Sequence, residues 1–218
     1  MTEDRYAERR WRMVYDQLQT RNIRDQVTLE AMSRVPRERF VREGDRRRAY
    51  GDHAMGIGSG QTISQPYIVA LMTQGLELTG SEKVLEVGTG SGYQAAVLAE
   101  TGCEVYTVER LAELSERAEG TIRDLGYDNV HFRVGDGTLG WPEEAPFGRI
   151  IVTAGAPEVP PTLGEQLAAP GILVIPVGDE RFQSLFQVKK DEEGALHQLR
   201  LCDCVFVKLI GEEGWRAS

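Results

Sequence analysis

The chain has 218 residues, of which 41% are hydrophobic and 27% are charged, and its formal net charge is −9. This length is sufficient for one domain with a complete hydrophobic core. No stretch holds the roughly 18 apolar residues that span a bilayer, and the charged N-terminus lacks the apolar segment of a signal peptide. We therefore expect a cytoplasmic protein with no membrane partner.

Basic residues near the N-terminus are interleaved with acids, and only Arg46-Arg47-Arg48 forms a run. Three charges on an acidic chain are a weak indication of nucleic-acid binding, so we expect no nucleic acid as partner. The cysteines are odd in number and form no CxxC pair: Cys103, Cys202 and Cys204. They predict reduced structural thiols, with neither a disulfide framework nor a metal site.

The N-terminal part predicts helices followed by a long loop. Apolar residues at helical spacing within residues 4–19 predict an amphipathic helix that packs on a larger body: Ala7, Trp11, Val14 and Leu18. A second helix is expected over 27–35, before Pro36. Residues 44–63 are glycine-rich and irregular, which predicts a long functional loop.

This loop leads into Ser64-Gln65-Pro66, where a helix is expected to begin. Local sequence predicts Ser64 as the N-cap and places Pro66 in the first turn. The free N–H groups of a helix N-terminus favour a carboxylate. Ser64 could therefore cap the helix and still belong to an anion site.

From Lys83 onward, short apolar strands alternate with amphipathic helices. Strands are predicted at Val84–Val87, Glu104–Glu109, Val130–Val134, Ile150–Thr153 and Gly171–Val177, and helices at about 92–101 and 111–125. This alternation predicts an α/β fold with a doubly wound, mostly parallel sheet of the Rossmann-like kind. After Gly178, the segments Leu185–Lys189 and Leu199–Leu209 predict an antiparallel pair at the sheet edge.

We expect one domain over residues 1–218, acting as a monomer. Residues 1–60 form its N-terminal helices and loop, 61–180 its cofactor-binding core, and 181–218 its C-terminal antiparallel strands.

The segment Glu86-Val87-Gly88-Thr89-Gly90-Ser91-Gly92 ends the first sheet strand and opens a helix. Doubly wound folds bind nucleotides at this place, and glycines let a ligand approach the main chain. The dinucleotide fingerprint G-x-G-x-x-G requires a small sixth residue, where this chain has Tyr93. The G-x-G-x-G pattern after an acid resembles instead the motif of S-adenosylmethionine methyltransferases.

Three acids end three successive predicted strands: Glu86, Glu109 and Asp136. A carboxylate after the second strand can accept hydrogen bonds from ribose hydroxyls, in NAD as well as in S-adenosylmethionine. Methyltransferases commonly hold the adenine amino group with the third acid, and Glu86 would contact the positive end of the cofactor, directly or through water. Any one acid could be a helix cap or a solvated residue. Together they predict a cofactor site that includes Gly88, Thr89, Gly90, Gly92, Arg110 and Gly137.

The most distinctive stretch, Gly60-Gln61-Thr62-Ile63-Ser64-Gln65-Pro66, closely resembles the pre-motif of protein-L-isoaspartate O-methyltransferases. The segments 31–41, 151–157 and 171–178 are similar to the same family, so the resemblance covers about residues 14–180. It implies that Ser64 is the catalytic residue and that Gln61, Thr62 and Ile63 lie beside the methyl donor. It also implies that the substrate is an L-isoaspartyl residue in a damaged protein or peptide, whose methyl ester then closes to a succinimide. Lys208 and Ile210 depart from the family pattern, so no role is assigned to residues 205–218.

The chemistry agrees with this resemblance. A substrate carboxylate with a pKa near ~4 is already ionised at neutral pH, so no general base is needed. The three histidines, at 53, 131 and 197, stand in no catalytic-looking pattern. Alignment of two reactants can lower a barrier by roughly 7–11 kcal/mol, and Ser64 would then orient the carboxylate. An extended substrate predicts a groove near 44–63 and 154–160.

Other functions remain open at the level of sequence. A methyltransferase with another acceptor is the nearest alternative, although Thr153-Ala154-Gly155-Ala156-Pro157 has no Asn or Asp with which to hold an amino group. An NAD(P)-dependent oxidoreductase is a second alternative, disfavoured by Tyr93 and Asp136. A non-catalytic adaptor that retains the fold is a third.

Overall fold

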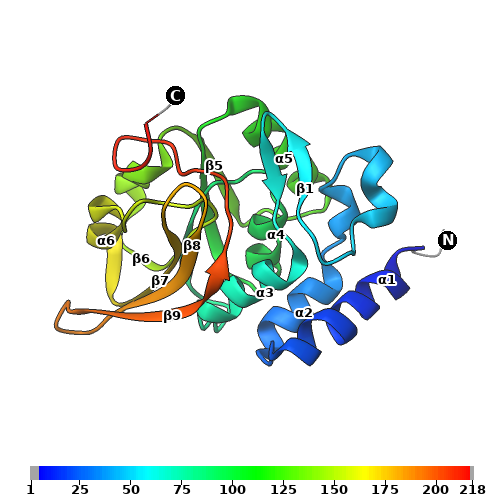
Figure 1. The fold of residues 1–218 in the computed structure, drawn as a ribbon, viewed down its shortest axis with the longest axis horizontal. Coiled ribbons are helices and arrows are strands. Elements are labelled where there is room, and N and C mark those ends of the chain that lie inside the picture. The colour runs from blue at the N-terminus through cyan, green and yellow to red at the C-terminus, as the bar shows by residue number, and fades with distance from the viewer. Residues whose placement is uncertain (1–4, 217–218) are drawn as a thin grey trace.

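The computed structural model describes residues 5–216, and a seven-stranded sheet forms its centre (Figure 1). Its strands, in the spatial order β5-β4-β3-β6-β7-β8-β9, are β3 (Lys83–Val87), β4 (Glu104–Glu109), β5 (Val130–Val134), β6 (Phe147–Val152), β7 (Leu167–Gly178), β8 (Gln183–Lys190) and β9 (Leu196–Cys204). Strands β3 to β7 pair in parallel, whereas β8 and β9 pair antiparallel. The predicted doubly wound sheet with an antiparallel C-terminal edge is therefore confirmed.

Helices cover both faces of this sheet. They are α1 (Ala7–Arg12), α2 (Gln26–Arg34), α3 (Pro66–Gly75), α4 (Tyr93–Glu100), α5 (Ala112–Asp124) and α6 (Pro161–Gln166). Helix α4 is buried from Tyr93 to Ala99 because α2 packs on its outer side, so that α4 lies inside the molecule. In the described part of the chain, no helix is long and apolar enough to cross a membrane.

The N-terminal helix has a different buried face from the one predicted. After α1 the chain continues as a π-helix, η1 (Met13–Leu18), and a 3₁₀ turn, η2 (Gln19–Arg21). Met13, at the start of η1, is fully buried, whereas the predicted core residue Trp11, which lies in α1 before the π turn, is 60% exposed. Ala7 is exposed as well, and Leu18 is buried as predicted.

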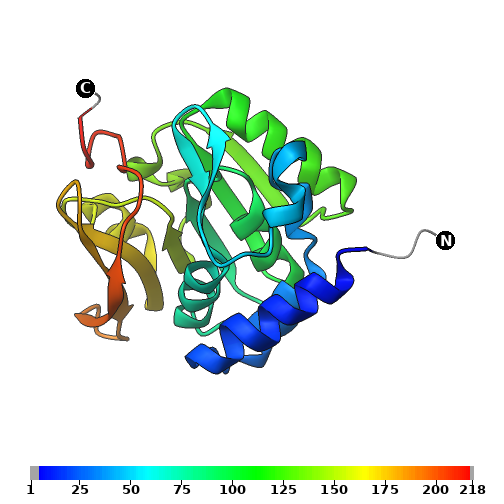
Figure 2. The same ribbon diagram turned by 45° about the vertical axis from the view of Figure 1, so that its right-hand side comes forward.

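The predicted irregular loop 44–63 contains regular structure. The 3₁₀ turn η3 (Arg37–Arg39) precedes it, η4 (Glu43–Arg48) spans its start, and a hairpin of β1 (Met55–Gly58) and β2 (Gln61–Ile63) ends it. Figure 2 shows this hairpin standing apart from the seven-stranded sheet. The short strands escaped prediction because their glycines break the alternating pattern of a strand.

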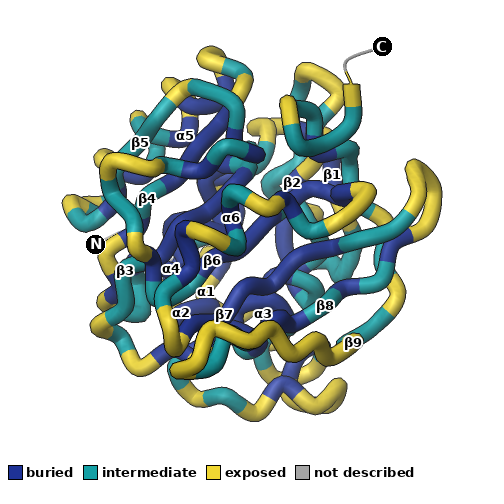
Figure 3. The backbone as a smooth tube through the Cα atoms, turned by 90° about the vertical axis from the view of Figure 1, so that its left-hand side faces the viewer, coloured by how far each residue is buried: buried dark blue, intermediate teal, exposed yellow. Residues whose placement is uncertain are grey.

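The C-terminal edge is the most exposed part of the sheet. Strand β9 is largely exposed along its first half, as Figure 3 shows, and pairs only with β8. A bulge interrupts the pairing, because Leu185 lies opposite Cys202 while Phe186 lies opposite Arg200. The strand ends at Cys204, earlier than the predicted Leu209, and the chain continues beyond it to a bridge between Lys208 and Gly155.

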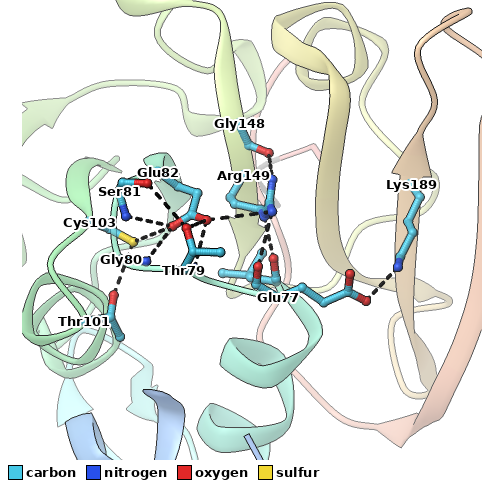
Figure 4. Close-up of polar contacts among 11 residues, drawn as sticks. Glu77, Thr79, Gly80, Ser81, Glu82, Thr101, Cys103, Gly148, Arg149 and Lys189 are labelled. Atoms are coloured by element: carbon cyan, nitrogen blue, oxygen red, sulfur yellow. Dashed lines mark hydrogen bonds and ion pairs between the residues drawn. The ribbon is translucent and has the colours of Figure 1, made fainter. Parts of the chain in front are cut away.

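A cluster of polar contacts around Arg149 lies near the start of β3, at the end of the sheet away from the glycine loop (Figure 4). Arg149 of β6 donates hydrogen bonds to the main-chain oxygens of Leu76 and Glu77, and its guanidinium lies 3.9 Å from the carboxylate of Glu82. Glu82 in turn accepts hydrogen bonds from the N–H groups of Thr79 and Gly80. This cluster ties the loop after α3 to the sheet.

The shifted face of the N-terminal helix can be tested by two substitutions. Met13→Ala removes a fully buried side chain and is expected to lower the free energy of unfolding by about 2–5 kcal/mol. Trp11→Ala loses only exposed surface and the stacking on Tyr15, at a ring distance of 5.1 Å, and should cost less than about 1.5 kcal/mol. Urea denaturation measures both free energies of unfolding. A larger loss for Trp11→Ala than for Met13→Ala would contradict the buried face that the structure shows.

Candidate active site

The glycine loop lies at the carboxyl end of β3, where the strand order changes direction. Strand β3 pairs with β4 on one side and with β6 on the other, which makes it the switch point at which doubly wound sheets bind ligands. Gly88, Gly90 and Gly92 all have positive φ, at 98°, 53° and 86°. A Cβ on Gly88 would stand 2.5 Å from Thr153 Oγ1, so only glycine fits there.

Glu109, at the end of β4, holds this loop in place. Its carboxylate accepts hydrogen bonds from the N–H groups of Gly90, at 2.9 Å, and Leu111, at 3.1 Å. The side chain lines a cavity above the sheet. Glu109 thus fixes the glycine loop and has its carboxylate beside the space where a ligand would lie.

Glu86 is buried beneath the loop and does not line the cavity. It accepts a hydrogen bond from the Thr107 hydroxyl, which also contacts the Thr89 hydroxyl at 2.6 Å, while Glu86 Oε1 has no partner among the residues described. Burial, reinforced by the charge of Glu109, raises the pKa of Glu86 to about 8. A direct contact with a ligand would require a rearrangement, so the predicted contact through a bridging water fits this position better.

Asp136, at the end of β5, already has partners. It caps the 3₁₀ turn η5 (Gly137–Leu139) by accepting hydrogen bonds from Thr138, and its second oxygen accepts the Glu212 N–H at 2.7 Å. Gly137 lines the cavity, but Asp136 does not. The predicted adenine contact of Asp136 stays a prediction.

The hairpin and the glycine loop face each other across one cavity of about 820 Å³, including its open mouth. The residues that were predicted from sequence and line it are Gln61, Thr62, Ile63, Ser64, Gly88, Thr89, Gly90, Glu109, Arg110 and Gly137. Gly92 lies just behind, where its missing side chain admits α5, since a Cβ there would stand 3.0 Å from that of Ala118. The two segments that the sequence analysis placed together thus form one site.

Ser64 does not cap helix α3, contrary to the interpretation from local sequence. The N-cap is Gln65, which makes no side-chain capping bond, and Asp52 accepts the N–H of Tyr67 at 3.1 Å. The helix N-terminus therefore already has a carboxylate, and it is not the anion site that was expected. In the described residues the Ser64 hydroxyl has no hydrogen-bond partner, which leaves it free at the cavity wall.

A second cavity, of about 1040 Å³ with its open mouth, adjoins the first. The two share four wall residues: Thr62, Ser64, Thr153 and Val207. The predicted groove near 44–63 is present in part, since Ala54 and Thr62 line this cavity together with the adjoining Ser64 and Gln65. Its other wall is formed by residues 202–207, and residues 154–160 do not line it.

The C-terminal segment supplies wall residues to which the sequence analysis gave no role. Val207, Lys208, Leu209 and Ile210 line the first cavity, and Lys208 Nζ lies 2.8 Å from the carboxylate of Glu180. The main chain of Leu209 hydrogen-bonds Gly155 and Trp215, which anchors the segment. No motif marks it in the sequence; its apolar run continues that of β9 and was assigned to the strand.

A G-x-G-x-G loop at the switch point of a doubly wound sheet, facing such a cavity, defines the class as S-adenosylmethionine-dependent methyltransferase. The model of the family described as "Protein-L-isoaspartate(D-aspartate) O-methyltransferase (PCMT)" matches residues 9–214. The chain belongs to this family.

Individual relatives and solved structures also match this family. The chain is 54% identical over 206 residues to the protein-L-isoaspartate O-methyltransferase of Geobacter metallireducens, covering 94% of this chain and 95% of the relative. For that of Desulfosudis oleivorans the identity is 53% over 216 residues, with 99% and 97% covered. A solved protein-L-isoaspartate O-methyltransferase matches with a TM-score of 0.85 and 30% identity over 94% of this chain and 67% of that one. A beta-aspartate methyltransferase from Plasmodium falciparum, solved with S-adenosyl-L-homocysteine, matches with a TM-score of 0.79 and 26% identity over 95% and 99%.

The raised pKa of Glu86 makes stability depend on pH. Between about pH 4.5 and about pH 8 the unfolded chain has lost this proton whereas the folded protein keeps it, so the free energy of unfolding falls as pH rises, by up to about 1.4 kcal/mol per pH unit. Glu86→Gln removes this contribution and should make the fall less steep. Urea denaturation of the ligand-free proteins across this range measures it, and equal slopes would contradict a protonated Glu86.

Proposed function

We propose that this chain transfers the methyl group of S-adenosyl-L-methionine to the free carboxylate of L-isoaspartyl residues in damaged proteins and peptides. One observation carries the proposal. Ser64 lies on the wall that the first and the second cavity share, and its hydroxyl has no hydrogen-bond partner in residues 5–216. A group at that boundary can contact a substrate on one side while the methyl donor lies on the other.

The first cavity fits the cofactor. Its walls come from the hairpin and the glycine loop, and the glycines of the loop leave its main chain open to a ligand. Glu109 has a carboxylate at the wall for ribose hydroxyls, and Gly137 and Arg110 border the same space. Glu86, with an unpartnered buried oxygen, would contact the positive end of the cofactor through water.

S-adenosyl-L-methionine, when bound, supplies a methyl group activated on a sulfonium. The residues of this chain orient the acceptor. Ser64 donates a hydrogen bond from its hydroxyl to the substrate carboxylate, which is already ionised at neutral pH and needs no base. Ile63 and Val207 border the site with apolar surface that limits water, and alignment supplies the main catalytic effect.

The second cavity suits a polypeptide substrate. It opens beside Ser64 and has walls of mixed character, with Tyr67 and Phe206 as aromatic surface and Arg21 and Asp203 as charged surface. An extended segment could lie there with its isoaspartyl side chain directed to Ser64. After methylation the neighbouring backbone nitrogen of the substrate attacks the ester carbonyl, methanol leaves, and the succinimide forms.

We also propose that the protein acts as a monomer and binds no nucleic acid. It is supported by the net charge of −9, which disfavours nucleic-acid contact. Transfer to an amino group is disfavoured by the position after β6, where Thr153 uses its hydroxyl to bond the main-chain oxygens of Val87 and Gly88.

The substrate class is tested with paired peptides that differ only in an aspartyl or isoaspartyl linkage. With radiolabelled S-adenosyl-L-methionine, incorporation is expected in the isoaspartyl peptide alone. Equal labelling of both peptides, or of neither, would refute the proposed substrate. A parallel titration with NADH should show no saturable binding, which separates this function from that of an oxidoreductase.

Ser64→Ala removes the proposed carboxylate donor and is expected to lower kcat by about 10- to 100-fold, while the Kd for S-adenosyl-L-homocysteine stays within about threefold. The matched control is Ser33→Ala, an exposed serine of α2 whose hydroxyl bonds the Glu30 main chain. The control should keep full activity. An unchanged kcat in Ser64→Ala would remove Ser64 from the reaction.

A further inference from the structure

A buried arginine connects the serine segment to the cofactor side of the site. Arg37, from the turn η3, has no exposed surface. Its Nη2 donates a hydrogen bond to the main-chain oxygen of Ser64 at 2.7 Å, and its Nε donates to that of Ala49 at 2.7 Å. One guanidinium thus fixes two points of the chain that leads into the active site.

The same guanidinium contacts the start of α4. Its carbon lies 4.7 Å from the ring centre of Tyr93, the residue that follows the glycine loop and lines the cofactor cavity. Phe40, three residues after Arg37, packs edge-on against that ring at 5.6 Å. Arg37 therefore bridges the acceptor segment and the donor side of the cavity.

The burial of the Arg37 guanidinium lowers the stability of the folded protein. Arginine remains charged in proteins, and no carboxylate of residues 5–216 forms an ion pair with this one. Burial lowers the pKa of Arg37, because the charged guanidinium loses its hydration. An apolar side chain in this space would leave the main-chain oxygens of Ala49 and Ser64 without this donor, so the guanidinium determines where the two segments lie.

We propose that Arg37 is a positioning residue for methyl transfer, which holds the Ser64 main chain at a fixed distance from the glycine loop. This proposal rests on the proposed function of Ser64. A fork with several donors can bond the oxygens of Ser64 and Ala49 together, whereas a lysine ammonium in the same space lacks that planar geometry. Arg37→Lys keeps the charge and loosens the segment.

A double-mutant cycle separates positioning from structural support. Arg37→Lys is expected to lower kcat by about 10- to 100-fold, because a shift of about 1 Å at a reacting group can cost on the order of 10²-fold. The Kd for S-adenosyl-L-homocysteine should stay within about threefold. In the Ser64→Ala background the same change should cost less than about threefold, since the group that Arg37 positions is already absent.

Arg149→Lys is the matched control. Arg149 also bonds two main-chain oxygens, those of Leu76 and Glu77, but at the far end of the sheet (Figure 4). It should lose stability and keep kcat. Rates are expressed per S-adenosyl-L-homocysteine site measured by calorimetry, so partial unfolding does not count as lost catalysis; if Arg37→Lys does not fold, Arg37→Gln takes its place in the cycle.

Three results would overturn the role of Arg37: a normal kcat in its variant, fully multiplicative losses in the double variant, or an equal loss in the Arg149 control. A normal kcat in Ser64→Ala would instead refute the function proposed for Ser64. The two failures are therefore distinguishable.

Discussion

The site depends on how a segment outside the main sheet is held over that sheet. Residues 61–65 pair with no strand of the seven-stranded sheet, and β2 bonds only to β1. Their placement comes from side chains elsewhere: Arg37 bonds the Ser64 oxygen, Asp52 the N–H of Tyr67, and Arg117 of α5 the oxygen of Ile57 in β1. A short hairpin is not stable by itself, so these ties determine where the serine lies.

Much of the fold follows from sequence because the parallel strands are buried on both faces. Strands β4 and β5 have the predicted bounds, since their apolar runs end at polar residues and turns. The N-terminal face could not be derived, because the polar residue Arg10 lies on the buried side and the aromatic Trp11 on the exposed side. The cap of α3 was missed because the competing acceptor, Asp52, lies outside the local window that capping rules consider.

For the site, the glycine loop, Glu109 and 61–64 were found because each is a contiguous motif at a strand or helix end. Val207 and Ile210 were not found, since they line the cavity from an irregular segment beyond the end of β9. Glu109 and Asp136 both hold main-chain N–H groups of neighbouring segments. Both acids thus hold the loops around the cavity, and Glu109 also borders it, a double role that spacing alone could not reveal.

The bulge and the charged residues of β9 affect whether another polypeptide chain can pair with this edge strand. A protein that accepts extended polypeptides beside Ser64 also has, on β9, an open row of backbone donors and acceptors with exposed Leu196 and Leu199. Such a row is a template on which any unfolded chain could add itself as a further strand. The bulge at Leu185–Phe186, together with the paired charges of Arg200 and Asp203, interrupts that template. The bulge and these charges therefore disfavour the addition of a further strand at this edge of the sheet.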